Sequence, residues 1–166
     1  METIKTYTNT KCELEMAKTR LSLLMDRKEQ LYCKYFPVTQ KLKDDVIKGG
    51  EKDNDKFANY LYELHNVDIG TGRSLAQEID YQRAVIDRNK TALDEMTETL
   101  KKTTGIEHEL YKEIVINCVS KTQAVKKVAD LFQKEERTIW KYHYSKIKKD
   151  LKSLEKVITC TVDVYV

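Results

Sequence analysis

The chain is poor in residues that form turns. It has one proline and five glycines among 166 residues, whereas average use is roughly 5% and 7%. Because β-sandwiches and barrels need a turn about every 8–12 residues, this shortage disfavours both. Charged residues make up 34% of the chain, above the roughly 25% of an average globular protein. The composition therefore predicts an all-α protein with long, solvent-exposed helices, in one domain or two small ones.

Long apolar runs are also missing. The mean hydropathy is −0.63, and no apolar stretch approaches the roughly 18 residues of a membrane span. Residues 1–11 lack the apolar core of a signal peptide. We therefore expect no membrane partner and a cytoplasmic location.

The sequence also lacks patterns for metal binding and catalysis. The cysteines form no C-x-x-C pair, and we interpret them as reduced intracellular thiols: Cys12, Cys33, Cys118 and Cys160. His108-Glu109 begins like a zinc-binding H-E-x-x-H motif, but Lys112 occupies the position of the second histidine. Gly70-Thr71-Gly72 lacks the Lys-Ser or Lys-Thr ending of a phosphate-binding loop. We expect no metal, no cofactor and no enzymatic activity.

Residues 1–102 form a first, helical region. Its first helix is predicted over residues 11–36 and ends before Pro37, which disfavours helix at the preceding residue. Two complementary apolar heptad positions mark this helix as amphipathic: Leu14, Leu21 and Tyr35 at one, and Ala17, Leu24 and Leu31 at the other. A shorter helix is predicted over 38–47, and Asp53-Asn54-Asp55 is expected to cap a third over 56–65.

A second long helix is predicted over residues 74–102, after a loop at 66–72. Isoleucine or leucine recurs there every seven residues: Ile79, Ile86, Leu93 and Leu100. Gln82 and Asn89 share the other apolar position with Leu75 and Met96, where their amides either fix the register when buried or face solvent. The two long helices either fold back as an antiparallel hairpin or pair between chains. An unsatisfied apolar seam on so small a protein favours a homo-oligomer.

The basic charge is concentrated late in the chain. Residues 118–156 hold eleven Lys or Arg and five Asp or Glu, a net charge of +6. The remainder holds nineteen basic and twenty-two acidic residues, a net charge of −3, and the two sum to the overall +3. A basic module on a mildly acidic body favours nucleic acid as the partner of that module. Lysine-rich helices that only face solvent are the alternative.

Residues 103–156 have the apolar spacing of a helix-turn-helix module. Helices are predicted over 106–119, 122–132 and 136–156, with Ser120 and Thr122 as candidate caps. The residues expected to face inward are, in chain order, Leu110, Ile114, Val115, Cys118, Val125, Val128, Ala129, Phe132, Ile139, Tyr142, Ile147, Leu151 and Leu154. Ala129 is the small residue that lets the two helices of the motif cross closely. Ile139, on the second of these helices, packs back under the first. Gln133 stands where such turns usually have a left-handed glycine, at a cost of about 1 kcal/mol if that geometry is kept.

The third helix of this module carries side chains that suit DNA. Arg137 can make a bidentate contact to guanine, and Glu136 can accept from cytosine N4. The other candidate contacts lie on its outer face or on the second helix: Lys121, Lys126, Lys127, Trp140, Lys141, Tyr144, Lys148 and Lys149, with Glu135, Lys146 and Lys152 nearby. Trp140 either lies outside beside Arg137 or turns inward, in which case Tyr142 or His143 faces out. A three-helix module that packs without binding DNA would show the same apolar spacing.

The segments Ala124–Phe132 and Glu136–Tyr142 resemble the DNA-binding end of sigma factors. More narrowly, they are similar to phage-encoded sigma-like regulators of the ArpU/RinA type, which place a helical region ahead of a C-terminal helix-turn-helix. The motif that carries the resemblance covers about 35 residues, and this chain has the same order of regions as those regulators over most of its length. It implies binding to double-stranded DNA at promoters, contact with RNA polymerase, and no catalysis.

Residues 157–166 change period. Ile158, Cys160, Val162, Val164 and Val166 alternate with the residues between them in a segment rich in β-branched residues, which predicts a C-terminal β-strand. Such a strand would pair with its twin or with a partner's sheet edge; a disordered or docked tail is the alternative.

Two functions of different classes follow from these features. The first is a sequence-specific, DNA-binding transcription regulator, with residues 1–102 for oligomerisation, 103–156 for DNA and 157–166 as the tail. The second is a structural or adaptor protein that binds another protein through its basic helix and C-terminal strand. An anti-repressor or a DNA-packaging protein is a third.

Overall fold

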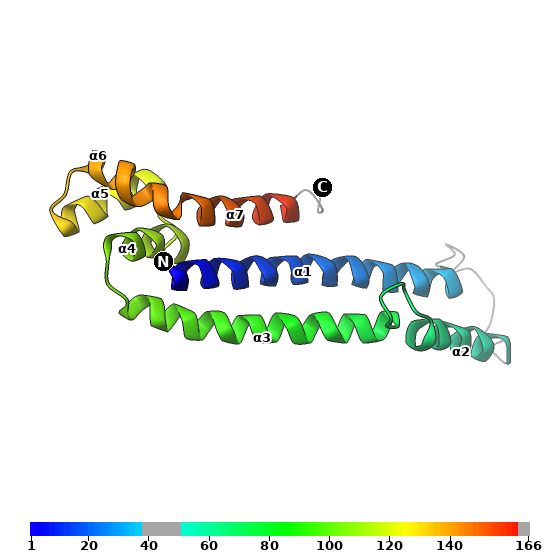
Figure 1. Cartoon of the computed structure of the whole chain (residues 1–166). Coiled ribbons are helices and arrows are strands. Elements are labelled where there is room, and N and C mark those ends of the chain that lie inside the picture. The colour runs from blue at the N-terminus through cyan, green and yellow to red at the C-terminus, as the bar shows by residue number, and fades with distance from the viewer. Residues whose placement is uncertain (38–50, 163–166) are drawn as a thin grey trace. The chain divides into compact units, whose positions relative to one another are not determined.

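The computed structural model describes residues 1–37 and 51–162; side chains are described for all of these except 51–53 and 158–162. Every regular element in this part of the chain is a helix, which confirms the all-α prediction (Figure 1). The α-helices are α1 (Glu2–Tyr35), α2 (Glu51–Asn66), α3 (Leu75–Lys102), α4 (Ile106–Tyr111), α5 (Lys121–Phe132), α6 (Glu136–Thr138) and α7 (Ser145–Val162). Two π-helical stretches adjoin them, η1 (Lys112–Ile116) and η2 (Ile139–Tyr144). Among the described residues, none of these helices has both the length and the apolar character needed to cross a membrane.

The chain divides into two compact units. The first contains residues 1–16 together with the chain from residue 87 onwards, and the second contains residues 17–86. Each unit contains one end of α1 and one end of α3. The two helices pack against each other within the chain and run in opposite directions. Their apolar seam is therefore covered intramolecularly, which removes the argument for a homo-oligomer from an unsatisfied seam.

The second unit has its core where α1, α2 and the start of α3 meet. Tyr60 and Leu64 of α2 are buried with Leu75 and Ile79 of α3, and residues of the predicted α1 seam pack on them: Leu21, Leu24, Leu31 and Tyr35. Ser74 and Gln77 cap α3 reciprocally, since each side chain accepts from the other residue's backbone N–H, at 3.3 and 3.0 Å. The predicted start of this helix is thus confirmed.

The connector between α2 and α3 is held by one carboxylate. Asp68 Oδ1 accepts hydrogen bonds from the backbone N–H groups of Gly70, Thr71 and Gly72 at 2.9, 3.1 and 2.9 Å. Gly70 and Gly72 have φ values of 92° and 76°, a conformation that L side chains rarely adopt. The resulting turn fixes Ile69 against the core of the second unit.

Burial also settles the amides of α3. Gln82 and Asn89 are only 3% and 4% exposed, so both lie inside the seam rather than at a solvated edge. Gln82 donates to Glu78 at 2.8 Å. Asn89 Nδ2 has no hydrogen-bond partner among the described residues.

Two helices begin earlier than the sequence pattern predicts. Helix α1 starts at Glu2 rather than near residue 11, because Ile4, Tyr7 and Thr8 are buried in the first unit. Helix α2 starts at Glu51, so Asp53-Asn54-Asp55 lies inside the helix and the predicted cap is wrong. The helix predicted over 38–47 lies outside the described residues.

The predicted C-terminal strand is wrong over the residues that can be compared. Helix α7 continues through residues 157–162, and the remaining residues, 163–166, are outside the described part. An isolated strand leaves its backbone N–H and C=O groups unpaired, whereas a helix pairs them locally. Continuation of a long preceding helix therefore prevails over β-branched alternation.

Candidate nucleic-acid interface

The three helices predicted within residues 103–156 are present in the structure and belong to the first unit. The first element is α4 with η1, the second is α5, and the third runs without a break through α6, η2 and α7. The residues predicted at the helix crossing are buried: Val125, Val128, Ala129, Ile139, Ile147, Leu151 and Leu154, together with Leu110. These elements, residues 106–156, are called the helix-turn-helix module below.

The turn of this module keeps the left-handed geometry despite its missing glycine. Gln133 has φ 51° and ψ 47°. Its backbone N–H donates to the Asp130 carbonyl at 3.3 Å, and the N–H of Lys134 donates to the Ala129 carbonyl at 2.9 Å. This pair of bonds is a Schellman ending for α5. At the other end of α5, Ser120 is the N-cap and accepts from the N–H of Gln123, as predicted.

Two residues predicted to face inward are exposed. Tyr142 is 54% exposed, and Cys118 is an exposed free thiol with φ 53°. Cys118 follows the end of η1, so it no longer shares the helical period of Leu110. Tyr142 lies within η2, where the wider π-turn changes which residues face the core.

The π-helical stretch η2 keeps one face of the third helix on the core. Its inner residues are four apart, at Ile139, His143, Ile147 and Leu151, and all are buried or half-buried. Steps of four drift by about 40° each on a helix of 3.6 residues per turn. A wider turn near the start of the series offsets that drift, and the same adjustment carries Tyr142 outward.

Some predicted DNA-contacting lysines are already engaged within the module. Lys121 at the start of α5 donates to Glu155 of α7 at 2.6 Å, and Lys127 donates to Glu113 of η1 at 2.9 Å. Hydrogen bonding to Glu155 raises the pKa of Lys121 further. Both ammonium groups remain partly exposed, but contact with a phosphate would compete with a carboxylate already in place.

A second set of cations is exposed and has no carboxylate partner among the described residues. Within the predicted site it comprises Lys126, Arg137, Lys141, Lys148 and Lys149, and outside it Lys134 and Lys152. Arg137 and Lys141 are one turn apart and share a face of the third helix, and Lys148 and Lys152, which lie beyond η2, are one turn apart and share a face with each other. Glu136 is also exposed at the start of that helix.

The aromatic side chains of the third helix lie differently from one another. Trp140 is half-buried and meets the ring of Tyr144 edge-on, with centroids 4.7 Å apart. Tyr142 faces out, and its ring lies 5.0 Å from the ammonium of Lys141. The tryptophan thus turns partly inward while Tyr142 takes the exposed position, the second of the two alternatives set out above.

An ion-paired cluster joins the third helix to α4. Glu107 of α4 accepts from Lys146 at 2.6 Å and lies 3.1 Å from Nδ1 of His143. Burial by itself would raise the pKa of Glu107, but the hydrogen bonds from Lys146, its own backbone and His143 outweigh burial and lower the pKa to about 2. Lys146 therefore positions the third helix on α4.

Sequence reasoning missed Lys134 in the turn and the acidic character of α4 with η1. Residues 106–117 hold three glutamates, Glu107, Glu109 and Glu113, against one lysine, Lys112, a net charge of −2. Adding the +6 of residues 118–156 gives +4 for the whole module. The signal was present in the sequence, in acidic residues placed just before the basic stretch.

No protein-family model matches the chain, and neither the curated proteins nor the solved structures searched gave a match. A left-handed turn between two crossing helices is shared by helix-turn-helix proteins of many kinds. The geometry therefore supports the motif without selecting one of its families.

Proposed function

We propose that this chain is a sequence-specific transcription regulator that binds double-stranded DNA through the helix-turn-helix module and acts at promoters without catalysis. The observation that carries the proposal is the group of exposed cations on the helix that follows a helix-turn-helix turn. Arg137, Lys141, Lys148 and Lys152 are exposed on that helix and have no carboxylate partner among the described residues. Action at promoters, with contact to RNA polymerase, rests on the resemblance to sigma-like regulators.

Within this proposal the start of the third helix reads sequence. Arg137 and Glu136 lie in its first turn, the part of a recognition helix that enters the major groove. The guanidinium of Arg137 suits guanine O6 and N7, and the carboxylate of Glu136 suits cytosine N4. Lys141 follows one turn later.

The other exposed lysines position the module on phosphates. Lys126 lies on α5, Lys134 in the turn, and Lys148 and Lys149 further along the third helix. Lys121, Lys127 and Lys146 contribute less, because each already binds a carboxylate. Phosphate contacts make affinity fall with salt, by a slope of about 0.9 per contact on logarithmic axes.

The test begins with selection of bound sequences from a random duplex library by the full chain. Fluorescence anisotropy then measures the affinity for the enriched duplex and for a scrambled one at several salt concentrations. We expect Arg137→Ala to lose about 1–3 kcal/mol of discrimination at one base pair. Arg83→Ala, an exposed arginine of α3 in the second unit, is the matched control and should leave binding unchanged.

Three results would overturn the proposal: no enriched motif, binding that does not depend on salt, or equal affinities for Arg137→Ala and Arg83→Ala. Capture of an acidic protein by the full chain, without binding to duplex at low salt, would instead favour an adaptor. A motif with two-fold symmetry would indicate that the chain binds as a homodimer.

A further inference from the structure

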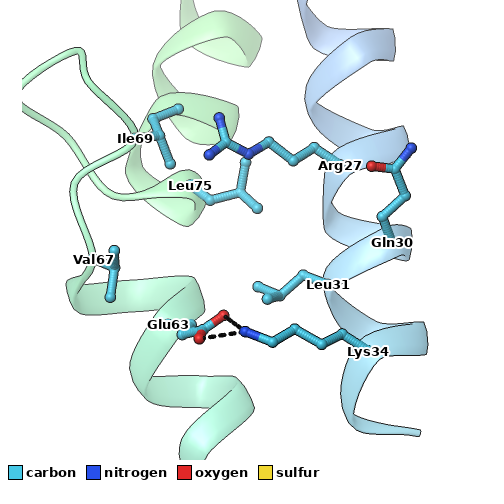
Figure 2. A pocket seen from close by; sticks show the side chains of 8 residues that line it. All are labelled: Arg27, Gln30, Leu31, Lys34, Glu63, Val67, Ile69 and Leu75. Atoms are coloured by element: carbon cyan, nitrogen blue, oxygen red, sulfur yellow. Dashed lines mark hydrogen bonds and ion pairs between the residues drawn. The ribbon is translucent and has the colours of Figure 1, made fainter. Parts of the chain in front are cut away.

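The second unit contains a pocket between α1 and the segment that joins α2 to α3 (Figure 2). Its volume is about 270 Å³. The apolar part of its lining comes from four aliphatic side chains, Leu31 of α1, Val67 and Ile69 of the connector, and Leu75 of α3. Its polar lining comes from Arg27, Gln30, Lys34 and Glu63.

A row of basic residues runs along α1 beside this pocket. Arg20, Arg27 and Lys34 are seven residues apart, so they lie on one side of the helix, two turns from one to the next. Lys34 faces Glu63 of α2 and donates to both its carboxylate oxygens, at 2.7 and 3.0 Å. Arg20 lies close enough to Glu78 of α3 to help lower the pKa of that carboxyl. Lys34 therefore has a carboxylate partner, whereas Arg20 only lies near Glu78, which Arg73 binds directly at 2.9 Å.

The middle cation, Arg27, has no such partner. Arg27 is exposed and has no carboxylate partner among the described residues. Figure 2 shows its side chain reaching from α1 towards Ile69 and Leu75, while Lys34 reaches towards Glu63 at the opposite end of the pocket. The charge of Glu63 is balanced by Lys34, and its carboxylate also accepts a hydrogen bond from the Tyr35 hydroxyl, so it does not supply the charge that Arg27 lacks.

The space next to Arg27 suits a small molecule. Liquid water occupies roughly 30 Å³ per molecule, so a volume of 270 Å³ corresponds to about nine non-hydrogen atoms. Binding pockets for drug-sized ligands usually measure about 300–1,000 Å³, so this pocket lies at the small end of that range. The lining offers one guanidinium, which binds carboxylates through paired N–H groups, next to four aliphatic side chains.

We propose that this pocket binds a small aliphatic carboxylate of about five to eight carbons. The ligand carboxylate would lie on the guanidinium of Arg27 and take the position that Glu63 holds opposite Lys34. Its hydrocarbon chain would pack on Leu31, Val67 and Leu75. The site lies wholly within the second unit, so the proposal does not depend on binding of DNA.

The test is a titration of the full chain with hexanoate, followed by NMR of the methyl groups. We expect saturable shifts of the methyl resonances of Leu31, Val67, Ile69 and Leu75, whereas those of Leu110 and Ile139 in the first unit stay in place. 1-Hexanol has the same hydrocarbon chain without the charge and should bind about tenfold more weakly.

Two variants complete the experiment. Arg27→Gln removes the charge and keeps a long side chain, and it should weaken hexanoate binding about tenfold without changing the binding of 1-hexanol. Arg83→Gln is the matched control, because Arg83 is an exposed arginine of the same unit that does not line the pocket, and it should bind hexanoate as the unaltered chain does. Methyl resonances that do not move with hexanoate would overturn the proposal. Equal hexanoate affinities for the Arg27→Gln and Arg83→Gln variants would overturn it as well.

Discussion

A single buried hydrogen bond ties the first turns of α1 to the helix-turn-helix module. The hydroxyls of Thr8 and Tyr111 lie 2.7 Å apart, and the two residues are 1% and 0% exposed. Burial raises the pKa of the Tyr111 hydroxyl, so the group stays protonated and able to donate. The ring of Tyr7 packs edge-on against that of Tyr111, at 6.0 Å between centroids.

We predict that Tyr111→Phe destabilises the first unit by about 1–2 kcal/mol, because it leaves the Thr8 hydroxyl buried without its partner. Thr8→Val, which keeps the shape of the side chain, should cost a similar amount. The double variant should cost less than the sum by about 1 kcal/mol, since removing both polar groups leaves nothing unsatisfied. For a protein of this size, 1 kcal/mol corresponds to a change of roughly 2–4 °C in Tm.

Urea denaturation followed by far-ultraviolet circular dichroism measures the free energy of unfolding of the unaltered chain, the two single variants and the double variant. Tyr142→Phe is the matched control, because Tyr142 is 54% exposed, and it should change stability by less than about 0.5 kcal/mol. Strictly additive effects of Tyr111→Phe and Thr8→Val would refute the reasoning, and so would a loss for Tyr111→Phe no larger than that of the control.

Three further predictions concern single residues. Gln133→Gly should stabilise the chain by about 0.5–1 kcal/mol in urea denaturation, because glycine adopts the left-handed conformation of this turn without strain; a loss of stability would contradict the strain argument. Asn89→Leu should raise Tm, because Asn89 Nδ2 is buried without a partner among the described residues, and a lower Tm would show that the amide is satisfied. Glu107→Gln should lower Tm at neutral pH. The folded-state pKa of Glu107, about 2, lies below the ordinary 4.5, so the loss of Tm should be full above about pH 4.5 and shrink as the pH falls towards 2. Thermal denaturation across that range measures it. A loss of Tm that does not change with pH would contradict the assigned role of the Glu107 carboxylate.

The spacing of apolar residues in the sequence predicted the parts of the fold that depend on helical periodicity. The crossing of α5 with the third helix could be placed from Ala129 and Ile139, because helical periodicity and a small residue mark it. The same periodicity failed at Tyr142, because one π-helical stretch changes the register and leaves no mark in the composition. It failed again at Ile4 and Thr8, whose burial depends on residues far along the chain.

The candidate DNA site was predictable in composition and only partly in detail. Which residues are basic is evident from the sequence, but which of the lysines already bind a carboxylate is not. Lys121 and Lys127 meet Glu155 and Glu113 only after the helices fold together. Arg27 could not have been singled out at all, because its significance comes from the pocket that it lines and from the carboxylate that Lys34 has and Arg27 lacks.

The bond between Thr8 and Tyr111 has a consequence for synthesis. The two residues are 103 positions apart, and ribosomes add about 5–20 residues per second, so Thr8 is made roughly 5–20 s before its partner. During that interval Ile4, Tyr7 and Thr8 lack the surface that later covers them, although Thr97 of α3 arrives somewhat sooner. The helix-turn-helix module therefore matures last and around a segment made long before it, so a nascent chain interrupted before α4 leaves Thr8 without its hydrogen-bond partner.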